Sequence, residues 1–309
     1  MKIFLIVFLF GTFLSISQTQ IDTTYTIKST FIKEVKKYPF IKIVDELTGN
    51  DSLIVSKDIK YHSLPNRDLF LDAYLKNDNK LHPAVILIHG GGWKSGDKNQ
   101  MHALAQKIAL RGYSCFCIEY RKSLEAKYPA AIIDVKNAIK FIKEKAQNYR
   151  VNPNKIAVLG CSSGGQMAAL VGTTNGNSKF EDSTSKPTAS VQAVIDMDGI
   201  LAFHHQESQE GKIAALWLGG DYEAVPNLWD EASALNNSGR FTPPILFINS
   251  SIPRYHAGQN DMIKILEKNG IYYEVKILDN SLHSFWFFQP WFEEIVNVST
   301  KFLDKIFKD

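Results

Sequence analysis

The chain has 309 residues and a formal net charge of +3. Lysines and arginines are spread along it rather than clustered, and so small a charge does not indicate a nucleic-acid partner. Three cysteines, an odd number, do not make a disulfide framework, and we expect three small buried side chains instead. The length exceeds the usual ~150 residues of one domain, but an α/β fold often runs this long as a single domain.

The N-terminus has the pattern of an exported protein. Met1 and Lys2 precede an apolar run at residues 3–14, and small residues follow up to Ser17. This is the arrangement of a secretory signal peptide. The run is well short of the roughly 20 apolar residues that a membrane-spanning helix needs. We therefore expect residues 1–17 to be cleaved, no membrane anchor, and a secreted or periplasmic protein.

The remainder, residues 18–309, is predicted to be one domain. Residues 18–50 are polar and irregular in pattern, and we predict an N-terminal extension that packs on the sheet. Runs at 58–62 and 69–74 flank the turn 65–67 and predict an antiparallel pair of strands.

Beyond this pair, strand-like and helix-like segments alternate. Predicted strands span residues 84–88, 113–119, 156–159, 191–197, 245–248 and 273–278, and predicted helices span 101–110, 129–145, 257–268 and 292–306. Such alternation predicts a mostly parallel central sheet with helices on both faces. Ligands bind at the carboxyl ends of the strands in such sheets. The connection 200–242 after strand six is longer than a plain loop, and we predict a small helical insertion over the site.

One motif lies where a predicted strand meets a helix. Residues 160–164 read Gly-Cys-Ser-Ser-Gly. Strand, tight glycine turn and helix are the setting of a nucleophile elbow, which exposes the hydroxyl of Ser162 above the sheet. An ordinary glycine-rich turn can have the same five residues, so this pattern alone is a weak signal.

A second motif follows the strand at 84–88. Residues 89–93 read His-Gly-Gly-Gly-Trp, an HGGG-type loop that supplies oxyanion-hole amides in esterases and lipases. The alternative is a phosphate-binding loop, but neither G-x-G-x-x-G nor Gly-Lys-Ser/Thr is present. The two motifs together predict a serine nucleophile and an oxyanion hole formed by the N–H groups of Gly91, Gly92 and Ser163.

With these motifs the chain resembles an α/β-hydrolase, close to bacterial carbohydrate esterases and hormone-sensitive-lipase-like esterases. The resemblance runs from about Tyr61 to the C-terminus, and residues 118–121 and 127–131 are similar to that family's exit from strand four. Residues 251–256 and the aromatic tail 283–292 resemble a subgroup from pectin- and xylan-degrading bacteria. The resemblance to this family implies the α/β-hydrolase fold and the hydrolysis of esters. No cofactor fingerprint or metal-ligand spacing is visible, so we expect neither a cofactor nor a metal.

The predicted base is His283. It follows the last predicted strand by five residues, in the loop where the family places its histidine. Three other histidines lie downstream of the serine. His204 and His205 are in the insertion, and His256 begins a helix, where capping or surface exposure explains it.

The acid departs from the usual pattern of the family. The loop 249–256 after strand seven, its usual place, contains no carboxylate. Asp198 ends strand six beside a glycine, similar to the acid of pancreatic-lipase-like enzymes, and it is our first choice. Asp196 lies deeper on the same strand face, Asp261 lies within a helix, and Asp279 is close to the predicted histidine. These alternatives stay open because only geometry settles a triad.

Four residues are candidates for binding substrate. Trp93 follows the glycine loop, and Trp286 and Trp291 lie in an aromatic run beside the predicted histidine. Their rings could stack on sugars or contact an acyl chain, or they could pack in the core. Arg254 could pair with a substrate carboxylate such as a uronate, or make an internal ion pair.

The leading hypothesis is therefore a secreted serine esterase acting on an acylated polysaccharide or oligosaccharide. It would remove acetyl, or else methyl or feruloyl, groups from pectin or xylan. A general short-chain esterase or lipase, a serine peptidase and a non-catalytic binding protein on a hydrolase scaffold are the alternatives. The sequence does not indicate the sugar, the acyl group or the oligomeric state.

Overall fold

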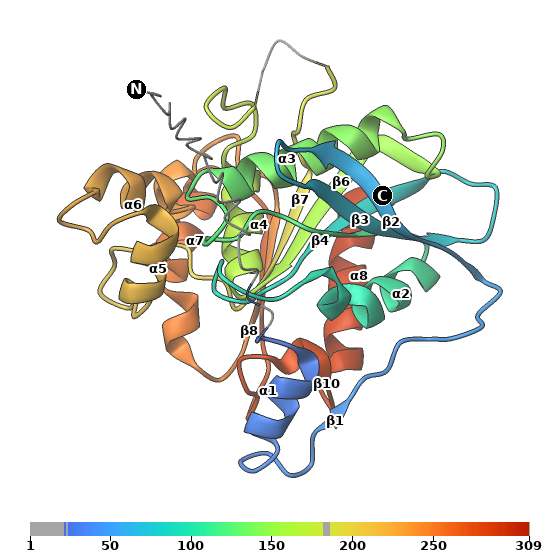
Figure 1. Ribbon diagram of the computed structural model, residues 1–309, viewed down its shortest axis with the longest axis horizontal. Helices are drawn as coiled ribbons and strands as arrows, with labels where there is room; N and C mark the ends of the chain where they lie inside the picture. The colour runs from blue at the N-terminus through green and yellow to red at the C-terminus, as the bar shows by residue number, and fades with distance from the viewer. Residues whose placement is uncertain (1–21, 23, 182–185, 309) are drawn as a thin grey trace, which may run out of the picture.

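The computed structural model describes residues 22, 24–181 and 186–308. The predicted signal peptide lies outside the described residues. An eight-stranded sheet forms the centre, in the order β2-β3-β5-β4-β6-β7-β8-β9 (Figure 1). Its strands are β2 (Leu53–Ser63), β3 (Asp68–Lys76), β4 (His82–Ile88), β5 (Ser114–Ile118), β6 (Val151–Cys161), β7 (Ala193–Met197), β8 (Ile245–Asn249) and β9 (Tyr273–Ile277).

The direction of the strands matches the prediction from the sequence. Strand β3 is antiparallel to both β2 and β5, and every other neighbouring pair is parallel. All residues of β4, β5, β7 and β8 are buried, as expected of strands covered on both faces.

Helices pack on both faces of this sheet and enclose two hydrophobic cores. On one face lie α2 (His102–Leu110) and α8 (Phe292–Phe307), and on the other α3 (Ala130–Glu144), α4 (Ser163–Thr173) and α7 (Gln259–Lys268). Short 3₁₀ helices span Lys98–Met101 (η1), Pro253–His256 (η3) and Phe285–Phe287 (η4). All three cysteines are buried and unpaired, in agreement with the prediction.

The insertion after the sixth strand of the large sheet is helical, as predicted. It contains α5 (Gly211–Leu218), α6 (Pro226–Ala232) and the 3₁₀ turn η2 (Leu235–Asn237). Trp217 of α5 stacks on Trp93 with ring centroids 5.1 Å apart. The insertion therefore rests directly on the residue that follows the glycine loop.

From residue 24 onward, the N-terminal extension has more secondary structure than its irregular pattern predicts. Helix α1 (Ile27–Glu34) begins with a capping box, in which the side chains of Thr26 and Ser29 each accept a hydrogen bond from the other's backbone N–H. Strand β1 (Lys42–Ile43) pairs antiparallel with β10 (Phe288–Gln289). Figure 1 shows α1 beside the C-terminal segment that leads into α8, so the extension packs on that segment.

Candidate active site

Ser162 occupies a sharp turn between β6 and α4. Its φ and ψ of 55° and −122° are unfavourable for a residue with a side chain, and such strain is typical of active-site positions. A Cβ on Gly160 would lie 1.9 Å from the carbonyl oxygen of Gly164, and one on Gly164 would lie 2.2 Å from that of Ile88. The turn is thus possible only because both flanking residues are glycines.

The glycine loop lies against this turn. A Cβ on Gly91, whose φ is +129°, would lie 2.1 Å from the carbonyl oxygen of Ser95, so the loop folds tightly back on itself. A Cβ on Gly90 would come within 2.9 Å of the carbonyl oxygen of Cys161. The loop and the serine turn therefore meet backbone to backbone, as an oxyanion hole built from Gly91, Gly92 and Ser163 requires.

His283 lies between Ser162 and Asp198. Its Nε2 is 2.8 Å from Ser162 Oγ, and its Nδ1 is 2.8 Å from Asp198 Oδ2. Both distances are those of ordinary hydrogen bonds. The ring is held by Tyr255, which stacks on it at 3.4 Å, and by the edge of Trp286 at 5.3 Å. The structure thus brings together the serine, histidine and aspartate that the sequence analysis selected.

Asp198 follows β7 and is almost fully buried. Its Oδ1 accepts hydrogen bonds from the backbone N–H of Ser250 at 2.7 Å and from Nε2 of His256 at 3.0 Å. Burial alone would raise the pKa of this carboxyl, but the hydrogen bonds from His256 and His283 outweigh it and lower the pKa. The carboxylate therefore stays ionised at neutral pH.

The interpretation of His256 as a helix-capping or surface residue is wrong, because its ring bonds the buried carboxylate of Asp198. This residue ends η3, in the connection after β8 where the family usually places its acid. That loop contains no carboxylate, and the histidine in it is the sequence signal for this contact. The loop thus contributes a donor to Asp198 instead of supplying the acid itself.

The other candidate acids lie elsewhere. Asp196 accepts a hydrogen bond from the N–H of Gly199 at 2.8 Å, and burial raises its pKa well above the ordinary value. Asp261 pairs at the surface with Lys264 and His205. The backbone carbonyl of Asp279 accepts a hydrogen bond from Trp291 Nε1.

The predicted substrate-binding tryptophans are all buried. Trp93 donates its Nε1–H to Gln166 Oε1 at 2.9 Å and borders a small cavity beside Ser162. Trp286 and Trp291 are only 2% and 6% exposed and belong to the core beneath α8. An aromatic run cannot reveal which ring faces solvent, and here these two rings pack inward rather than offering a surface to a sugar.

Arg254 makes the internal ion pair that the sequence analysis left open. Its Nη1 lies 3.2 Å from Glu210 Oε1, and its guanidinium lies over the ring of Tyr255, 4.1 Å from the centroid. The arginine therefore holds Tyr255, which in turn covers His283.

Two cavities meet at Tyr255. The first, which we call the serine cavity, is about 30 Å³ in volume and is bordered by Gly92, Trp93, Ser162, Ile200 and other residues. The second is about 500 Å³ and is bordered by one face of α1 together with Tyr255 and His283. We call it the α1 pocket.

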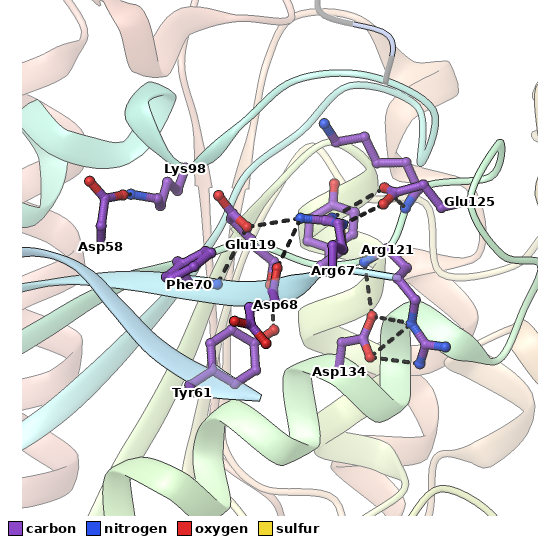
Figure 2. Close-up of polar contacts among 12 residues, drawn as sticks. Asp58, Tyr61, Arg67, Asp68, Phe70, Lys98, Glu119, Arg121, Glu125 and Asp134 are labelled. Atoms are coloured by element: carbon purple, nitrogen blue, oxygen red, sulfur yellow. Dashed lines mark hydrogen bonds and ion pairs between the residues drawn. The ribbon is translucent and has the colours of Figure 1, made fainter. Parts of the chain in front are cut away.

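Ion pairs fix the exit of β5 next to the glycine loop. Figure 2 shows Arg67 between Glu119 and Glu125, and Arg121 on Asp134. These contacts flank Tyr120, whose ring stacks on His89 at 4.3 Å and whose hydroxyl donates to the His89 carbonyl at 3.0 Å. Burial lowers the pKa of His89 to about 3, so this first residue of the glycine loop is neutral.

Metal-binding clusters and membrane-spanning helices are both absent from the part of the chain that the structure describes. Within residues 22, 24–181 and 186–308, no cluster of three or more His, Cys, Asp or Glu side chains could hold a metal ion. In the same part of the chain, no helix combines the length and the apolar composition needed to cross a membrane.

Residues 71–253 match the model of the BD-FAE family. Among curated proteins, the esterase LipC of Mycobacterium tuberculosis is 28% identical over 190 residues, covering 59% of this chain and 47% of LipC. The probable carboxylic ester hydrolase LipM of the same organism is 34% identical over 122 residues, covering 39% of this chain and 28% of LipM. The chain thus spans half or less of the length of these relatives.

Solved structures share the fold. A truncated carbohydrate esterase from gut microbiota has a TM-score of 0.71 at 22% identity, covering 84% of this chain and 99% of that one. An acetyl ester-xyloside bifunctional hydrolase from Caldicellulosiruptor lactoaceticus has a TM-score of 0.69 at 23% identity, covering 81% and 96%. At these identities the likeness shows the fold alone, which is that of the α/β-hydrolases.

Proposed function

Since this chain belongs to the BD-FAE family and has the α/β-hydrolase fold, we propose that it is a serine carboxylic-ester hydrolase. The observation that carries the proposal is the pair of 2.8 Å contacts that joins Ser162 through His283 to Asp198, beside a loop of three glycines. Curated relatives named as esterases support the same activity.

The arrangement accounts for each step of ester hydrolysis. His283 Nε2 takes the proton of Ser162 as Oγ attacks the ester carbonyl, and Asp198 holds the imidazole tautomer and stabilises the imidazolium. Backbone N–H groups of Gly91, Gly92 and Ser163 bind the developing oxyanion, each donor being worth about 3 kcal/mol. His283 then protonates the departing alcohol, and water releases the acid from Ser162.

The serine cavity favours a small acyl group. A cavity must have a volume of about 10–15 Å³ to hold one water molecule. The serine cavity, at about 30 Å³, therefore admits a group of about two heavy atoms, such as the methyl and carbonyl carbons of an acetyl group. We therefore propose acetyl as the acyl group, in preference to the bulky feruloyl group.

A polysaccharide is the proposed alcohol, and the protein is proposed to be secreted or periplasmic. Support comes from the N-terminal sequence pattern and from two neighbours whose titles name a carbohydrate esterase and an acetyl ester-xyloside hydrolase. The alternative, a general short-chain esterase, would share the acyl preference but would not distinguish sugar acetates from simple ones.

The test is hydrolysis by the purified protein of p-nitrophenyl acetate, acetylated xylan and acetylated pectin. We expect Ser162→Ala to lose all activity and to keep the fold, because the Ser162 hydroxyl is only partly buried and contacts His283 rather than the core. Activity on p-nitrophenyl acetate without acetate release from either polysaccharide would favour the general esterase. Unchanged turnover in Ser162→Ala would rule out Ser162 as the nucleophile.

A further inference from the structure

The α1 pocket is bordered by His283, the residue that would protonate the departing alcohol of an ester. The departing oxygen has to lie within hydrogen-bond reach of the residue that protonates it. His283 borders this pocket, whereas Ser162 and the glycine loop border the serine cavity. The volume of about 500 Å³ falls in the range of roughly 300–1,000 Å³ that small-molecule sites have.

One wall of the pocket is a face of α1 and the residues that follow it. Side chains at helical spacing line it: Ser29, Thr30, Lys33, Glu34, Lys37 and Tyr38. Hydroxyl and carboxylate groups of this kind form hydrogen bonds with the hydroxyls of a sugar, and they favour a polar ligand over an aliphatic chain.

The wall is fixed rather than loosely attached. The hydroxyl of Tyr25 is hydrogen-bonded to Ser284 Oγ at 3.0 Å, next to His283. The backbone carbonyl of Tyr25 accepts a hydrogen bond from Gln100 Nε2 at 2.8 Å. Strands β1 and β10 tie the far end of the segment to the aromatic tail. A ligand in the pocket thus meets a preformed surface.

The charged side chains of the pocket lining are two lysines and one glutamate, Lys33, Lys37 and Glu34, so positive charge is in excess there. They lie in a lysine-rich segment, since residues 24–42 contain five lysines and one acidic residue. Glu34 is paired with Lys33 at 3.5 Å, and Lys37 lies over the ring of Tyr38. Positive charge concentrated beside a cleft raises the local concentration of anionic ligands.

We infer that the α1 pocket binds the alcohol part of the substrate and that this alcohol is an anionic sugar, one that carries a carboxylate such as a uronate. The inference rests on the proposed function and extends it to the substrate class. Lys33 and Lys37 supply the positive charge at the pocket. Arg254, the cation considered from sequence, is already paired with Glu210.

The experiment compares Lys33→Gln/Lys37→Gln with a matched control, Lys28→Gln/Lys36→Gln. All four lysines are exposed on the same segment, but Lys28 and Lys36 lie outside the pocket lining. The substrates are an acetylated galacturonate oligosaccharide, an acetylated xylose oligosaccharide without uronate, and p-nitrophenyl acetate.

For the pocket variant we expect KM on the galacturonate substrate to rise roughly 3- to 10-fold, because two partly exposed ion pairs with the carboxylate are lost. The value of kcat on this substrate should not change. The rise in KM should shrink at high salt. KM on the other two substrates, and all values of the control variant, should stay at the wild-type level.

An equal rise in KM on the charged and neutral sugars, or an equal effect of the control variant, would overturn the inference. The p-nitrophenyl acetate reaction separates this failure from that of the proposed function. If the wild-type protein did not hydrolyse that ester, the esterase proposal itself would fail.

Discussion

His256 Nε2 donates a hydrogen bond to Asp198 Oδ1 at 3.0 Å, while Asp198 Oδ2 binds His283. The carboxylate is thus held at both oxygens by imidazole rings, and the N–H of Ser250 adds a third donor. Two opposed donors fix the rotation of a buried carboxylate, and so fix the ring that it orients.

We predict that His256→Ala lowers kcat roughly 3- to 30-fold and leaves KM within twofold. Asp198 keeps two of its three donors in this variant but loses one that favours its charged form. Steady-state kinetics on p-nitrophenyl acetate measures both constants. His205→Ala is the control, because His205 binds the surface carboxylate of Asp261. Equal activity of the His256 variant and the wild type would show that the contact is structurally present but catalytically idle.

Asp198→Asn is expected to reduce kcat by up to ~10⁴-fold. The amide keeps the size of the side chain, but it no longer favours the imidazole tautomer that can accept the proton of Ser162. The control is Asp196→Asn, a neighbouring buried aspartate that bonds Gly199. Activity should stay within about threefold of wild type there, and a reversed order of the two variants would reassign the acid.

Asp196→Asn should also change how stability depends on pH. The folded protein retains a proton on Asp196 that the unfolded chain releases above a pH of about 3.9. Stability from this group is therefore full below that pH and falls as pH rises through the folded pKa. Urea unfolding at pH 5 and pH 8 measures the effect. We expect the variant to gain stability relative to wild type between these two pH values, and a constant difference would mean that Asp196 is ionised in the folded protein.

Ile200→Ala should enlarge the serine cavity and relax the preference for acetyl. One methylene in a closed apolar pocket is worth roughly a factor of 10–200 in discrimination. We expect the ratio of kcat/KM for p-nitrophenyl butyrate to that for the acetate to rise about tenfold. Leu201→Ala is the control, since Leu201 is buried in the core. An unchanged ratio would place the acyl group outside this cavity.

The features predicted from sequence are those fixed by local spacing. Glycines at 160 and 164 permit a sharp turn in which any Cβ would clash, so a strand, these two glycines and a helix were enough to predict the position of Ser162. Asp198 followed from the end of a recognisable strand and from the missing carboxylate in loop 249–256.

The features that were missed depend on contacts between distant segments. Helix α1 has a sequence signal in its capping box, but its place beside His283 depends on pairing with the C-terminal tail. The hydrogen bond from His256 to Asp198 joins residues that are 58 positions apart in the sequence. Trp286 and Trp291 are buried because they pack against α8 and the N-terminal extension. A run of aromatic residues in the sequence does not show which of its side chains make such contacts.

The central claim is that Ser162 is the nucleophile, and covalent labelling tests it most directly. The protein is treated with a diethyl phosphate ester bearing a p-nitrophenolate leaving group, and peptide mass spectrometry locates the phosphoryl group. We predict one label per chain, on Ser162, with activity lost in proportion to labelling and no label in Ser162→Ala. A label on another residue that abolishes activity, or full activity after Ser162 is labelled, would contradict the account.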